Sequence, residues 1–422
     1  MKIVHVTQYF MPELGYQETF LAKRQIELGH EVTVVTADRY YPYPNYESQF
    51  EPLLGQRIVG AGRRMEEGID TWRLPCKEWR NHPWCNTLTD AINQLDPDVV
   101  HLHSLAHFMA LPVVRMKNRG ARFRLIADEH GTAQVNNRSL PFRLYRGFFR
   151  GFLSRSLSRA AHGVVGVTTD SSELANRVWG VPTEKIGMIP LGSDHRVFRH
   201  TEKGRKAVRR RLGLADDARV ILFSGKIIAN KKVMSLIEAL PVVLARVPKA
   251  VLVLVGHPDT AYLAAMKSRA QELGVADRVL VCGAVKAVEL PAWFSAADLA
   301  CWPWEVTISM VDAASCGLPF LAPRNEGVEY QLSAGNGEFI DDMSLAPESF
   351  GNQIAALLSD PARLADMGAR GRHLVETELS WDAVNDRFME LYEGGPVTGY
   401  RCCEESVSGE EAAGTEPVEQ GA

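Results

Sequence analysis

The sequence predicts an α/β fold made of two doubly wound, Rossmann-like domains, each built on a parallel sheet, that face each other across a cleft. Three observations support this prediction. Short β-branched runs alternate with helical patterns, the runs are apolar on both faces, and a polar stretch divides them into two groups. A length of 422 residues is also too great for one ordinary hydrophobic core, so two domains are expected.

Short runs rich in β-branched residues mark the expected strands. The first group is 3–6, 32–36, 99–102, 125–127 and 164–167, and the second group is 220–223, 251–255, 279–282, 299–301 and 320–322. The charge-dense stretch 199–219 separates the groups, so we place the domain boundary near residue 196. We predict an irregular loop region over 40–70, and a last helix over 381–392 from the spacing of its apolar residues.

These limits divide the chain into four parts. We predict an N-terminal domain over 1–195, a C-terminal domain over 196–375, and a helix over 376–393 that packs back toward the first domain. Residues 394–422 turn to Glu, Gly, Ser and Ala, and we expect them to form a disordered acidic tail without a catalytic role.

The composition is that of a soluble globular protein, and it excludes several function classes. Hydrophobic residues make up 46% and charged residues 23%, which argues against disordered, collagenous and coiled-coil proteins. The formal net charge of −4 gives no global positive charge that would point to nucleic acid. Seven cysteines without a Cys-x-x-Cys pair favour a reducing compartment and argue against zinc. No apolar run is long enough to span a bilayer, so we expect a cytoplasmic location.

The turn after the run 220–223 is the first candidate ligand site. Gly225, Lys226 and Lys231 lie between that run and an apolar helical pattern. A glycine permits close backbone approach, and two amines at the mouth of a strand–helix turn suit a diphosphate. The alternative is a solvated lysine cluster, which we favour for Lys232 alone.

A second strand–helix turn follows the run 299–301. Glu305 lies just past that run and Asp312 lies one turn inside the following helix, so both carboxylates are placed to reach polyol hydroxyls. Backbone amides at the start of this helix are placed to bind phosphate. These amides belong to Thr307, Ile308 and Ser309. The alternative for Asp312 is a capping box with Ser309, in which the carboxylate only satisfies first-turn amides.

With these turns in place, the chain resembles the retaining GT-B glycosyltransferases of family four over residues 1–392. The resemblance rests on an ordered set of segments, each of them weak alone. They are the loop at Gly15, 28–36 (LGHEVTVVT), 97–103 (PDVVHLH), 130–131 (HG), 189–194 (IPLGSD), 225–231, 253–256 (VLVG), 316–319 (CGLP) and 327–329 (GVE). The resemblance implies transfer of a sugar from a UDP- or GDP-sugar to a hydroxyl, with retained configuration. It implies an acceptor-side domain first and a nucleotide-sugar-binding domain second.

The resemblance also implies roles for single residues. Lys226 and Lys231 match the basic pair that holds the donor diphosphate, although a lysine at 226 replaces the commoner arginine, so that bidentate contact gives way to a point charge. Asp312 matches the second acid of a Glu-x7-Glu motif, which binds ribose. The first acid should fall at Trp304, whereas the carboxylate is at Glu305, one position later.

Three further positions follow from the same resemblance. His130 matches a histidine near the donor sugar, Gly15 belongs to the early glycine loop, and backbone near Val285 is expected to bind the base. The leaving phosphate takes the acceptor proton in the mechanism that the resemblance implies, so neither a metal nor any cofactor besides the donor is expected. Asp96 and Asp98 have the Asp-x-Asp spacing of metal-dependent transferases, but they precede a strand and are interpreted as turn residues.

His101 and His103 stand two positions apart, within and just after the strand expected over 99–102. We expect one of them to face each side of the sheet. On this view His101 is structural, and His103 lies either in the cleft or in the core.

Two other functions stay open beside an active transferase. The displaced Glu305 and the lysine at 226 fit a catalytically silent GT-B scaffold that serves as a binding partner. A sugar-nucleotide epimerase on the same fold is the second alternative. The sugar, the base and the acceptor are not identified by the sequence.

Residues 138–159 carry six arginines, and no acidic residue occurs between Glu129 and Asp170. Helical spacing is followed by Phe142, Tyr145, Phe149, Phe152 and Leu153, interleaved with Arg143, Arg146, Arg150 and Arg155. This pattern is typical of a helix that lies in an anionic lipid surface. It is equally typical of a domain helix that buries its aromatic residues and solvates its arginines. In the first case contact with the membrane is peripheral, and the acceptor is a lipid-linked or other membrane-bound saccharide.

Overall fold

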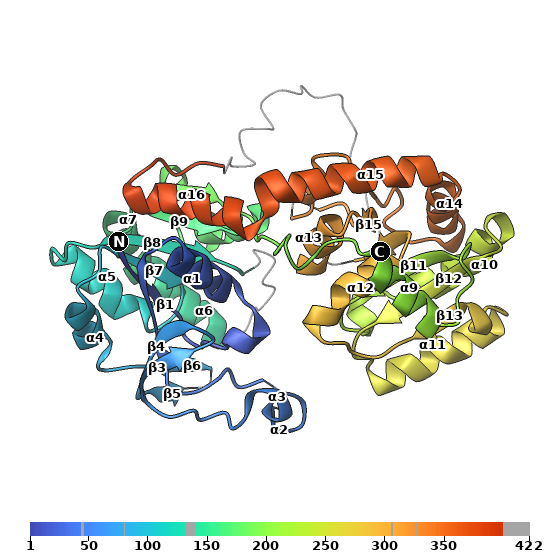
Figure 1. Cartoon of the computed structure of the whole chain (residues 1–422). Helices are drawn as coiled ribbons and strands as arrows, with labels where there is room; N and C mark the ends of the chain where they lie inside the picture. Colours follow the sequence, from blue (N-terminus) through green and yellow to red (C-terminus); the bar gives the residue numbers. More distant parts are fainter. Residues whose placement is uncertain (44–45, 80, 132–139, 305–306, 326, 400–422) are drawn as a thin grey trace, which may run out of the picture. The chain divides into compact units, whose positions relative to one another are not determined.

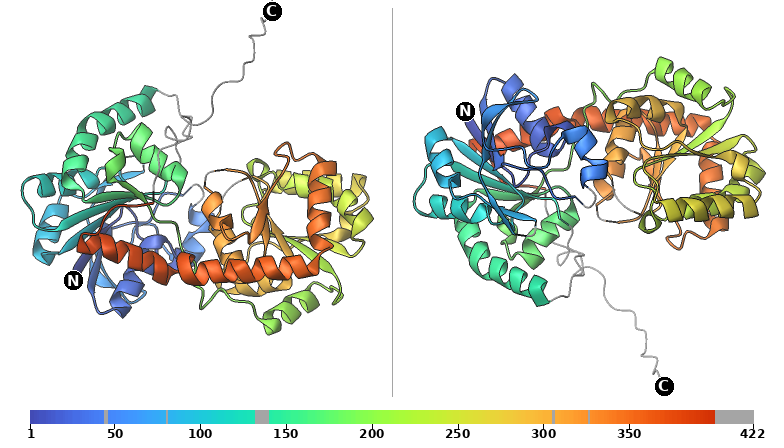
Figure 2. Two further views of the ribbon diagram at one scale, coloured as in Figure 1. Left: turned by 90° about the horizontal axis from the view of Figure 1, so that it is seen from above. Right: turned by 90° about the horizontal axis from the view of Figure 1, so that it is seen from below.

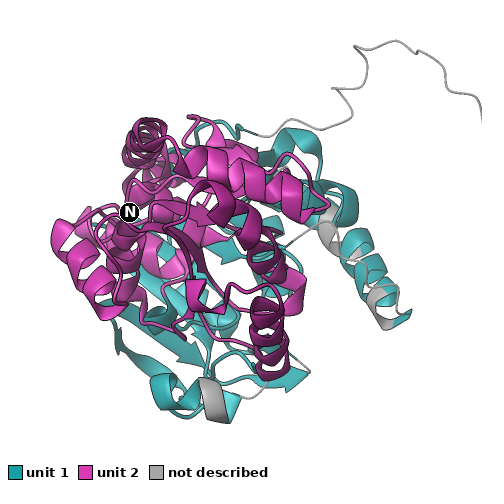
Figure 3. Ribbon diagram, turned by 90° about the vertical axis from the view of Figure 1, so that its right-hand side faces the viewer, with its two compact units in different colours: residues 1–14, 29–189, 390–422 teal, residues 15–28, 190–389 magenta. Residues whose placement is uncertain are grey.

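The computed structural model describes residues 1–43, 46–79, 81–131, 140–304, 307–325 and 327–399 (Figure 1). The chain forms two compact units, shown in different colours in Figure 3. Unit 1 comprises Met1–Leu14, Gly29–Ile189 and Glu390–Ala422, and unit 2 comprises Gly15–Leu28 and Pro190–Met389. The predicted domain limits stay a prediction. No helix in these described ranges is long and apolar enough to cross a membrane.

Unit 1 is built on an eight-stranded sheet with the order β10-β9-β8-β7-β1-β2-β4-β3. Its strands are β1 (Lys2–Val6), β2 (Glu31–Ala37), β3 (Gly62–Glu66), β4 (Ile69–Leu74), β7 (Val99–His103), β8 (Arg124–Glu129), β9 (Gly163–Gly166) and β10 (Ile186–Met188). Neighbouring strands are parallel except at the edge, where β3 runs antiparallel to β4. A separate antiparallel hairpin joins β5 (Lys77–Trp79) to β6 (His82–Trp84).

Helices cover both faces of this sheet (Figure 2). The helical segments of unit 1 are η1 (Pro12–Leu14), α2 (Tyr46–Gln49), α3 (Glu51–Leu54), α4 (Leu88–Leu95), α5 (Ala110–Asn118), α6 (Leu140–Phe148), the π-helical turn η2 (Phe149–Leu153), α7 (Ser154–Ala160), α8 (Thr169–Glu173), η3 (Leu174–Val178) and η4 (Thr183–Lys185). The core of the unit brings buried residues of β1, β7 and β8 together with Ile92 of α4, Val113 of α5 and Leu157 of α7. Strands that are buried on both faces explain why their sequences read as unbroken apolar runs.

Unit 2 is built on a six-stranded parallel sheet with the order β13-β12-β11-β14-β15-β16. Its strands are β11 (Arg219–Ser224), β12 (Ala250–Val255), β13 (Val279–Val281), β14 (Leu299–Cys301), β15 (Phe320–Ala322) and β16 (Gly337–Phe339). Its helices are α1 (Gln17–Glu27), α9 (Glu202–Arg211), η5 (Ala229–Lys231), α10 (Met234–Arg246), α11 (Thr260–Glu272), η6 (Ala276–Arg278), η7 (Ala287–Glu289), α12 (Leu290–Ala296), α13 (Ile308–Ser315), η8 (Glu329–Leu332), α14 (Pro347–Leu358), α15 (Pro361–Leu374), η9 (Val375–Leu379) and most of α16 (Trp381–Glu393).

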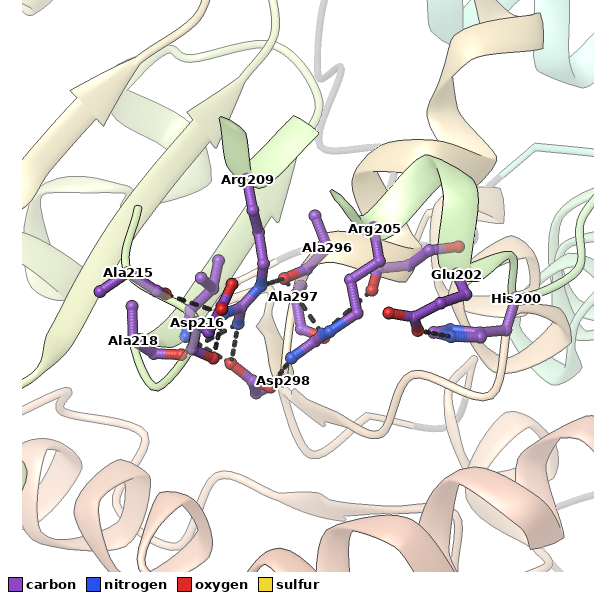
Figure 4. A network of polar contacts seen from close by, with 12 residues as sticks. His200, Glu202, Arg205, Arg209, Ala215, Asp216, Ala218, Ala296, Ala297 and Asp298 are labelled. Carbon is purple, nitrogen blue, oxygen red and sulfur yellow. Dashed lines mark hydrogen bonds and ion pairs between the residues drawn. The ribbon is translucent and has the colours of Figure 1, made fainter. Parts of the chain in front are cut away.

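The charge-dense stretch 199–219 contains α9, whose arginines hold it against the N-terminal edge of the second sheet (Figure 4). Nη2 of Arg209 lies 2.9 Å from one oxygen of Asp298, and Nη2 of Arg205 lies 3.1 Å from the other. Arg209 is only 5% exposed, and its Nε also donates to the carbonyl of Ala296 at 3.1 Å. Two of the charges that separate the two groups of strands in the sequence, Arg205 and Arg209, are therefore structural.

All of the runs expected to be strands are strands, which confirms two parallel-sheet α/β units. The prediction of an irregular region over 40–70 is wrong over 46–54, where the short helices α2 and α3 lie, and at its end, where β3 and the start of β4 lie. Strand β4 was missed because it contains Arg73, which breaks the apolar run. Arg73 is fully buried, and Glu66 neutralises it with contacts of 2.8 Å and 2.7 Å.

Candidate functional site

The strand order places a switch point in the sheet of each unit. In unit 2 the chain moves outward from β11 to β13 and then returns to β14 on the other side of β11. In unit 1 the corresponding point lies between β1 and β7. Ligands of open parallel sheets bind beyond the carboxyl ends of the strands at such points.

At the switch point of unit 2 lies a pocket of about 380 Å³. It is formed by the segments that follow β11 and β14. Its lining residues are Phe223, Ser224, Gly225, Lys226, Ile228, Asn230, Lys231, Trp302, Pro303, Trp304 and Thr307. The predicted diphosphate turn and the predicted second turn thus meet in one pocket.

The backbone of the first turn is held by a close approach of two glycines. Gly256 follows β12 with a φ of 151°, and a Cβ at this position would lie 1.7 Å from the carbonyl oxygen of Gly225. Gly225 itself has a φ of 143°, and its amide donates to Val255 at 2.9 Å. Only glycine fits this approach, because any side chain at 256 would displace the turn. The turn carries Lys226 and Lys231 to the pocket wall.

The lysines of this turn differ in their surroundings. Lys226 is exposed and Lys231, at the end of η5, is half-buried. Lys232, which we expected to be a solvated side chain, instead places its Nζ 3.6 Å from the ring centroid of Trp304. This cation–π contact fixes one wall of the pocket, because Trp304 also lines it.

Asp312 does not cap its helix, so the capping-box alternative is wrong. The N-cap of α13 is Thr307, whose hydroxyl accepts from the amide of Ser309 at 3.4 Å. Asp312 is 8% exposed and accepts a hydrogen bond of 2.6 Å from the hydroxyl of Ser193. Burial raises the pKa of Asp312 to about 7, although the Ser193 hydrogen bond lowers it. It is absent from the lining of the 380 Å³ pocket.

The stability of the protein is expected to depend on the ionisation of Asp312. Its folded-state pKa of about 7 exceeds the unfolded value of about 3.9, so the free energy of unfolding falls as the pH rises from about 4 to about 7. Asparagine keeps an acceptor for Ser193 and carries no charge. Asp312→Asn should therefore stabilise the protein by about 2–4 kcal/mol at pH 8 and have little effect near pH 4.

Urea unfolding of both proteins across this pH range measures the difference. A difference between variant and unmodified protein that stays constant with pH would contradict an Asp312 that titrates near neutrality.

The other predicted donor residues of unit 2 are placed as follows. Glu305 lies outside the described residues. Ile308 is exposed and Ser309 is half-buried, both in the first turn of α13. Gly15 has a φ of 66° just before α1, and Val285 is half-buried after β13. Their roles in donor binding stay a prediction.

At the switch point of unit 1, histidines surround the buried carboxylate of Asp128. Oδ2 of Asp128 lies 2.7 Å from Nδ1 of His103 and 3.2 Å from Nε2 of His101. Oδ1 accepts from the amide of Ser104 at 2.9 Å and lies 3.3 Å from Nε2 of His130. These neighbours hold the pKa of Asp128 well below its usual range, although burial alone would raise it. Asp128 is therefore an ionised group that orients three imidazoles.

The network extends from this carboxylate in two directions. Nε2 of His103 lies 2.9 Å from Nδ1 of His5, and Nδ1 of His101 lies 2.7 Å from the hydroxyl of Tyr392 in the last turn of α16. Burial lowers the pKa of His101 to about 4, so this ring is neutral at pH 7. Because Nε2 of His101 faces the carboxylate of Asp128, it carries the ring proton, and Nδ1 accepts from the tyrosine.

The prediction that His101 and His103 face opposite sides of the sheet is wrong. Side chains two positions apart on a strand lie on the same face, and the two imidazole centroids are 4.3 Å apart. Sequence reasoning also missed His5 and Asp128. Strand register would have found them, because His5 pairs with His101 on β7 and His103 pairs with Asp128 on β8.

The donor atoms of His103, Asp128 and His130 lie within 4.8 Å of one another, as do those of His5, His101 and His103. Imidazole and carboxylate ligands suit zinc. The contacts of 2.7 Å and 2.9 Å on either side of His103 are hydrogen-bond lengths, and they occupy both of its nitrogens. The absence of a metal stays a prediction.

Two family descriptions match the chain. They are "Glycosyl transferase 4-like domain" over residues 19–192 and "Glycosyl transferases group 1" over residues 204–374. Among curated relatives, a GDP-mannose-dependent alpha-(1-6)-phosphatidylinositol monomannoside mannosyltransferase of Mycolicibacterium smegmatis is 31% identical over 405 residues, covering 92% of this chain and 97% of the relative. A D-inositol 3-phosphate glycosyltransferase of Thermobispora bispora is also 31% identical, with 88% and 87% covered.

Solved structures show the same fold at low sequence identity. Anabaena Alr3699/HepE in complex with UDP has a TM-score of 0.70 at 17% identity, covering 93% of this chain and all of that one. Sucrose-phosphate synthase from Thermosynechococcus elongatus has a TM-score of 0.66 at 19% identity, covering 93% and 98%. The chain therefore belongs to the group 1 glycosyltransferases of family four and has the GT-B fold.

Proposed function

We propose that this glycosyltransferase moves a hexose from a nucleoside diphosphate to a hydroxyl of a lipid-linked saccharide, with retained anomeric configuration. The observation that carries the proposal is the cationic pocket at the switch point of unit 2, where Gly225 brings Lys226 and Lys231 to one wall. We favour GDP-mannose as the donor, because the Mycolicibacterium relative is named as dependent on it.

The reaction follows from the charges in this pocket. The ammonium groups of Lys226 and Lys231 bind the donor diphosphate and stabilise the charge that develops as the sugar–phosphate bond breaks. The acceptor hydroxyl forms the new bond to the sugar from the same face, and its proton passes to the departing phosphate oxygen. No pair of protein carboxylates flanking the bond is required, and no metal is used.

The remaining residues bind the donor sugar or hold its binding groups in place in this proposal. Glu305 binds hydroxyls of the donor sugar. Asp312 acts through Ser193, which joins the segment before α9 to the helix that begins at the pocket. His130 contacts the sugar near the reacting carbon, and Asp128 orients it through the contact of 3.3 Å.

Thermal stabilisation by a panel of nucleotide sugars tests the donor assignment. A ligand at about 100 times its dissociation constant adds roughly 2.7 kcal/mol to the stability of the protein that it binds. We expect GDP-mannose and GDP to stabilise the unmodified protein, and the Lys226→Ala/Lys231→Ala variant to lose the effect. Stabilisation by no nucleotide sugar would contradict the proposal. Binding without turnover would favour the silent scaffold, and donor conversion without an acceptor would favour the epimerase.

The acceptor side of the proposal rests on the exposed face of α6. Leu140, Leu144 and Phe148 are 65%, 65% and 46% exposed, and they are four residues apart. They therefore form one apolar row along the helix. Exposed arginines lie along α6, η2 and α7. They are Arg143, Arg146, Arg150, Arg155 and Arg159.

The prediction of which apolar residues face lipid is wrong at two positions. Phe149 is 1% exposed and belongs to the core of unit 1, and Tyr145 is half-buried against that core. The side chains of Phe142, Phe152 and Leu153 lie outside the described residues. One face of the helix is thus buried, as in the domain-helix alternative, while the opposite face keeps an apolar row.

The β5–β6 hairpin, which contacts α6 through His82, carries two further exposed apolar side chains. Trp79 is 61% exposed and Trp84 is 46% exposed. The ring centroids of Trp84 and Phe108 are 5.9 Å apart. The imidazole of His82 stacks on the ring of Tyr145 of α6, with 5.3 Å between the centroids. Tryptophan is enriched at the interface between lipid and water. The apolar row of α6, its arginines and the hairpin together fit the surface of an anionic membrane, on its cytoplasmic side.

Co-sedimentation with anionic vesicles is expected to depend on this surface. The unmodified protein should bind vesicles of mixed phosphatidylcholine and phosphatidylglycerol at low salt, and less as salt rises. Leu144→Ser/Phe148→Ser should weaken binding at every salt concentration, and Arg146→Ala/Arg150→Ala should remove mainly the salt-dependent part. Leu53→Ser is the matched control, because Leu53 is 63% exposed elsewhere in unit 1. Absence of vesicle binding at low salt would leave a soluble acceptor.

A further inference from the structure

Two cysteines lie at the base of the β5–β6 hairpin. The register of the hairpin pairs Lys77 with Trp84, Glu78 with Pro83 and Trp79 with His82. One step beyond the first of these pairs, Cys76 stands opposite Cys85. Both thiols are free, and among the described cysteines the others are Cys282, Cys301 and Cys316 of unit 2.

The type of the cross-strand pair follows from a proline. Opposite residues alternate between pairs that exchange two backbone hydrogen bonds and pairs that exchange none. Pro83 has no amide proton, so Pro83 and Glu78 cannot exchange two backbone hydrogen bonds. Because the two kinds of pair alternate along the hairpin, Cys76 and Cys85 form a pair that exchanges no backbone hydrogen bonds. The Cα atoms of such a pair are about 4.5 Å apart. A disulfide spans Cα separations of about 4.4–6.8 Å.

The two cysteines differ in access. Each thiol shifts the pKa of the other. Cys76 is half-buried, and its Sγ lies 3.2 Å from Oδ1 of Asp38, whereas Cys85 is 5% exposed. The Cys85 thiol lowers the pKa of Cys76, while Asp38 acts in the opposite direction. The Cys76 thiol, together with burial, raises the pKa of Cys85.

We propose that Cys76 and Cys85 form a peroxide-sensitive dithiol that closes into a cross-strand disulfide. The Cys76 thiolate attacks one oxygen of hydrogen peroxide and breaks the O–O bond, which gives a sulfenic acid and, with one proton, water. The Cys85 sulfur then attacks the Cys76 sulfur. The S–S bond forms, and hydroxide leaves as water with the proton of Cys85. Two thiols are oxidised and one peroxide is reduced to two waters, and a dithiol reductant reverses the change by exchange.

The disulfide would close the base of a hairpin that connects several parts of unit 1. Glu78 within this ring accepts from the hydroxyl of Tyr9 at 2.6 Å and binds Arg57 at 2.7 Å. Oxidation therefore fixes the hairpin that carries the exposed tryptophans. The proposal does not depend on the glycosyltransferase reaction, because its residues and its readout are separate from the donor pocket.

The test is mass spectrometry of the full-length protein after treatment with hydrogen peroxide. We expect loss of two hydrogens, restored by a dithiol reductant, and a single cross-linked peptide that joins Cys76 to Cys85. In Cys85→Ser the reaction should stop at a sulfenic acid on Cys76 that dimedone traps, and Cys76→Ser should form no cross-link. Cys282→Ser is the control, because Cys282 is also half-buried, and it should behave like the unmodified protein.

Three results would overturn the proposal. The first is peroxide treatment that leaves both thiols intact while other cysteines react. The second is a cross-link of Cys76 to Cys402 or Cys403, and the third is a Cys85→Ser variant that still forms an intramolecular disulfide at Cys76. Circular dichroism of each serine variant before treatment shows whether it is folded.

Discussion

Replacing Lys231 with alanine is expected to lower turnover by about a hundredfold or more, because one fixed charge at a developing anion is worth about 3–4 kcal/mol. Lys231 ends the short helix η5 and lines the pocket together with Lys226. The loss should fall on kcat and on kcat/KM, since the charge acts most strongly when the diphosphate departs. Steady-state kinetics with a nucleotide-sugar donor measures the effect.

Lys203→Ala is the matched control for this variant, because Lys203 is an exposed lysine of α9 outside the pocket. It should leave turnover unchanged. Lys232→Ala should weaken donor binding modestly rather than stop turnover, since its ammonium lies on Trp304 at the pocket wall. Equal activity of Lys231→Ala and the unmodified protein would show that the pocket does not bind the leaving diphosphate.

Asp128→Asn is expected to destabilise the protein by about 3–5 kcal/mol at pH 7, the range for breaking a buried charge network. The buried carboxylate is ionised and faces His101, His103 and His130. An amide would set one of its own N–H groups against these donors. Urea or guanidinium unfolding measures the loss.

The pH dependence of the stability loss distinguishes the loss of an ionised carboxylate from a simple loss of packing. The folded-state pKa of Asp128 lies below its unfolded value, so its stabilising effect is present above about pH 4 and is lost as the pH falls through the folded pKa. The difference between Asp128→Asn and the unmodified protein should therefore shrink in acid. Asp98→Asn is the control, because Asp98 is an exposed carboxylate bound to one backbone amide. If Asp98→Asn lowered the free energy of unfolding as much as Asp128→Asn does, a special role for the histidine network around Asp128 would be contradicted.

The fold was largely predictable because both sheets are parallel and covered on both faces. Buried strands such as β1 and β12 then read as unbroken apolar runs. The donor turn was predictable for a related reason, since glycine and paired lysines directly follow one of these strands. The polar strand β4 was not predictable, because Arg73 needs its partner Glu66, which belongs to another strand.

The parts that sequence analysis missed depend on contacts between distant segments. The hydroxyl that holds Asp312 belongs to Ser193, 119 residues away. His101 and His103 of β7 face Asp128 of β8, and the register between these two strands is not written in any local pattern. Periodicity along 138–159 showed that a helix forms but not which face is buried. The rows Tyr145–Phe149 and Leu144–Phe148 have the same spacing, and only packing separates the buried row from the exposed one.

An active, retaining glycosyltransferase with a lipid-linked acceptor, as we propose, should transfer labelled sugar from its donor to lipid. The most direct measurement incubates it with labelled GDP-mannose and membrane lipid extract, and follows the label, the released GDP and the anomeric configuration of the product by nuclear magnetic resonance. We expect lipid-extractable label in α linkage, the configuration that mannose has in GDP-mannose, with equimolar GDP. We expect none of these with Lys226→Ala/Lys231→Ala. Donor binding without transfer to any lipid-linked acceptor, or a product of inverted configuration, would contradict the proposal.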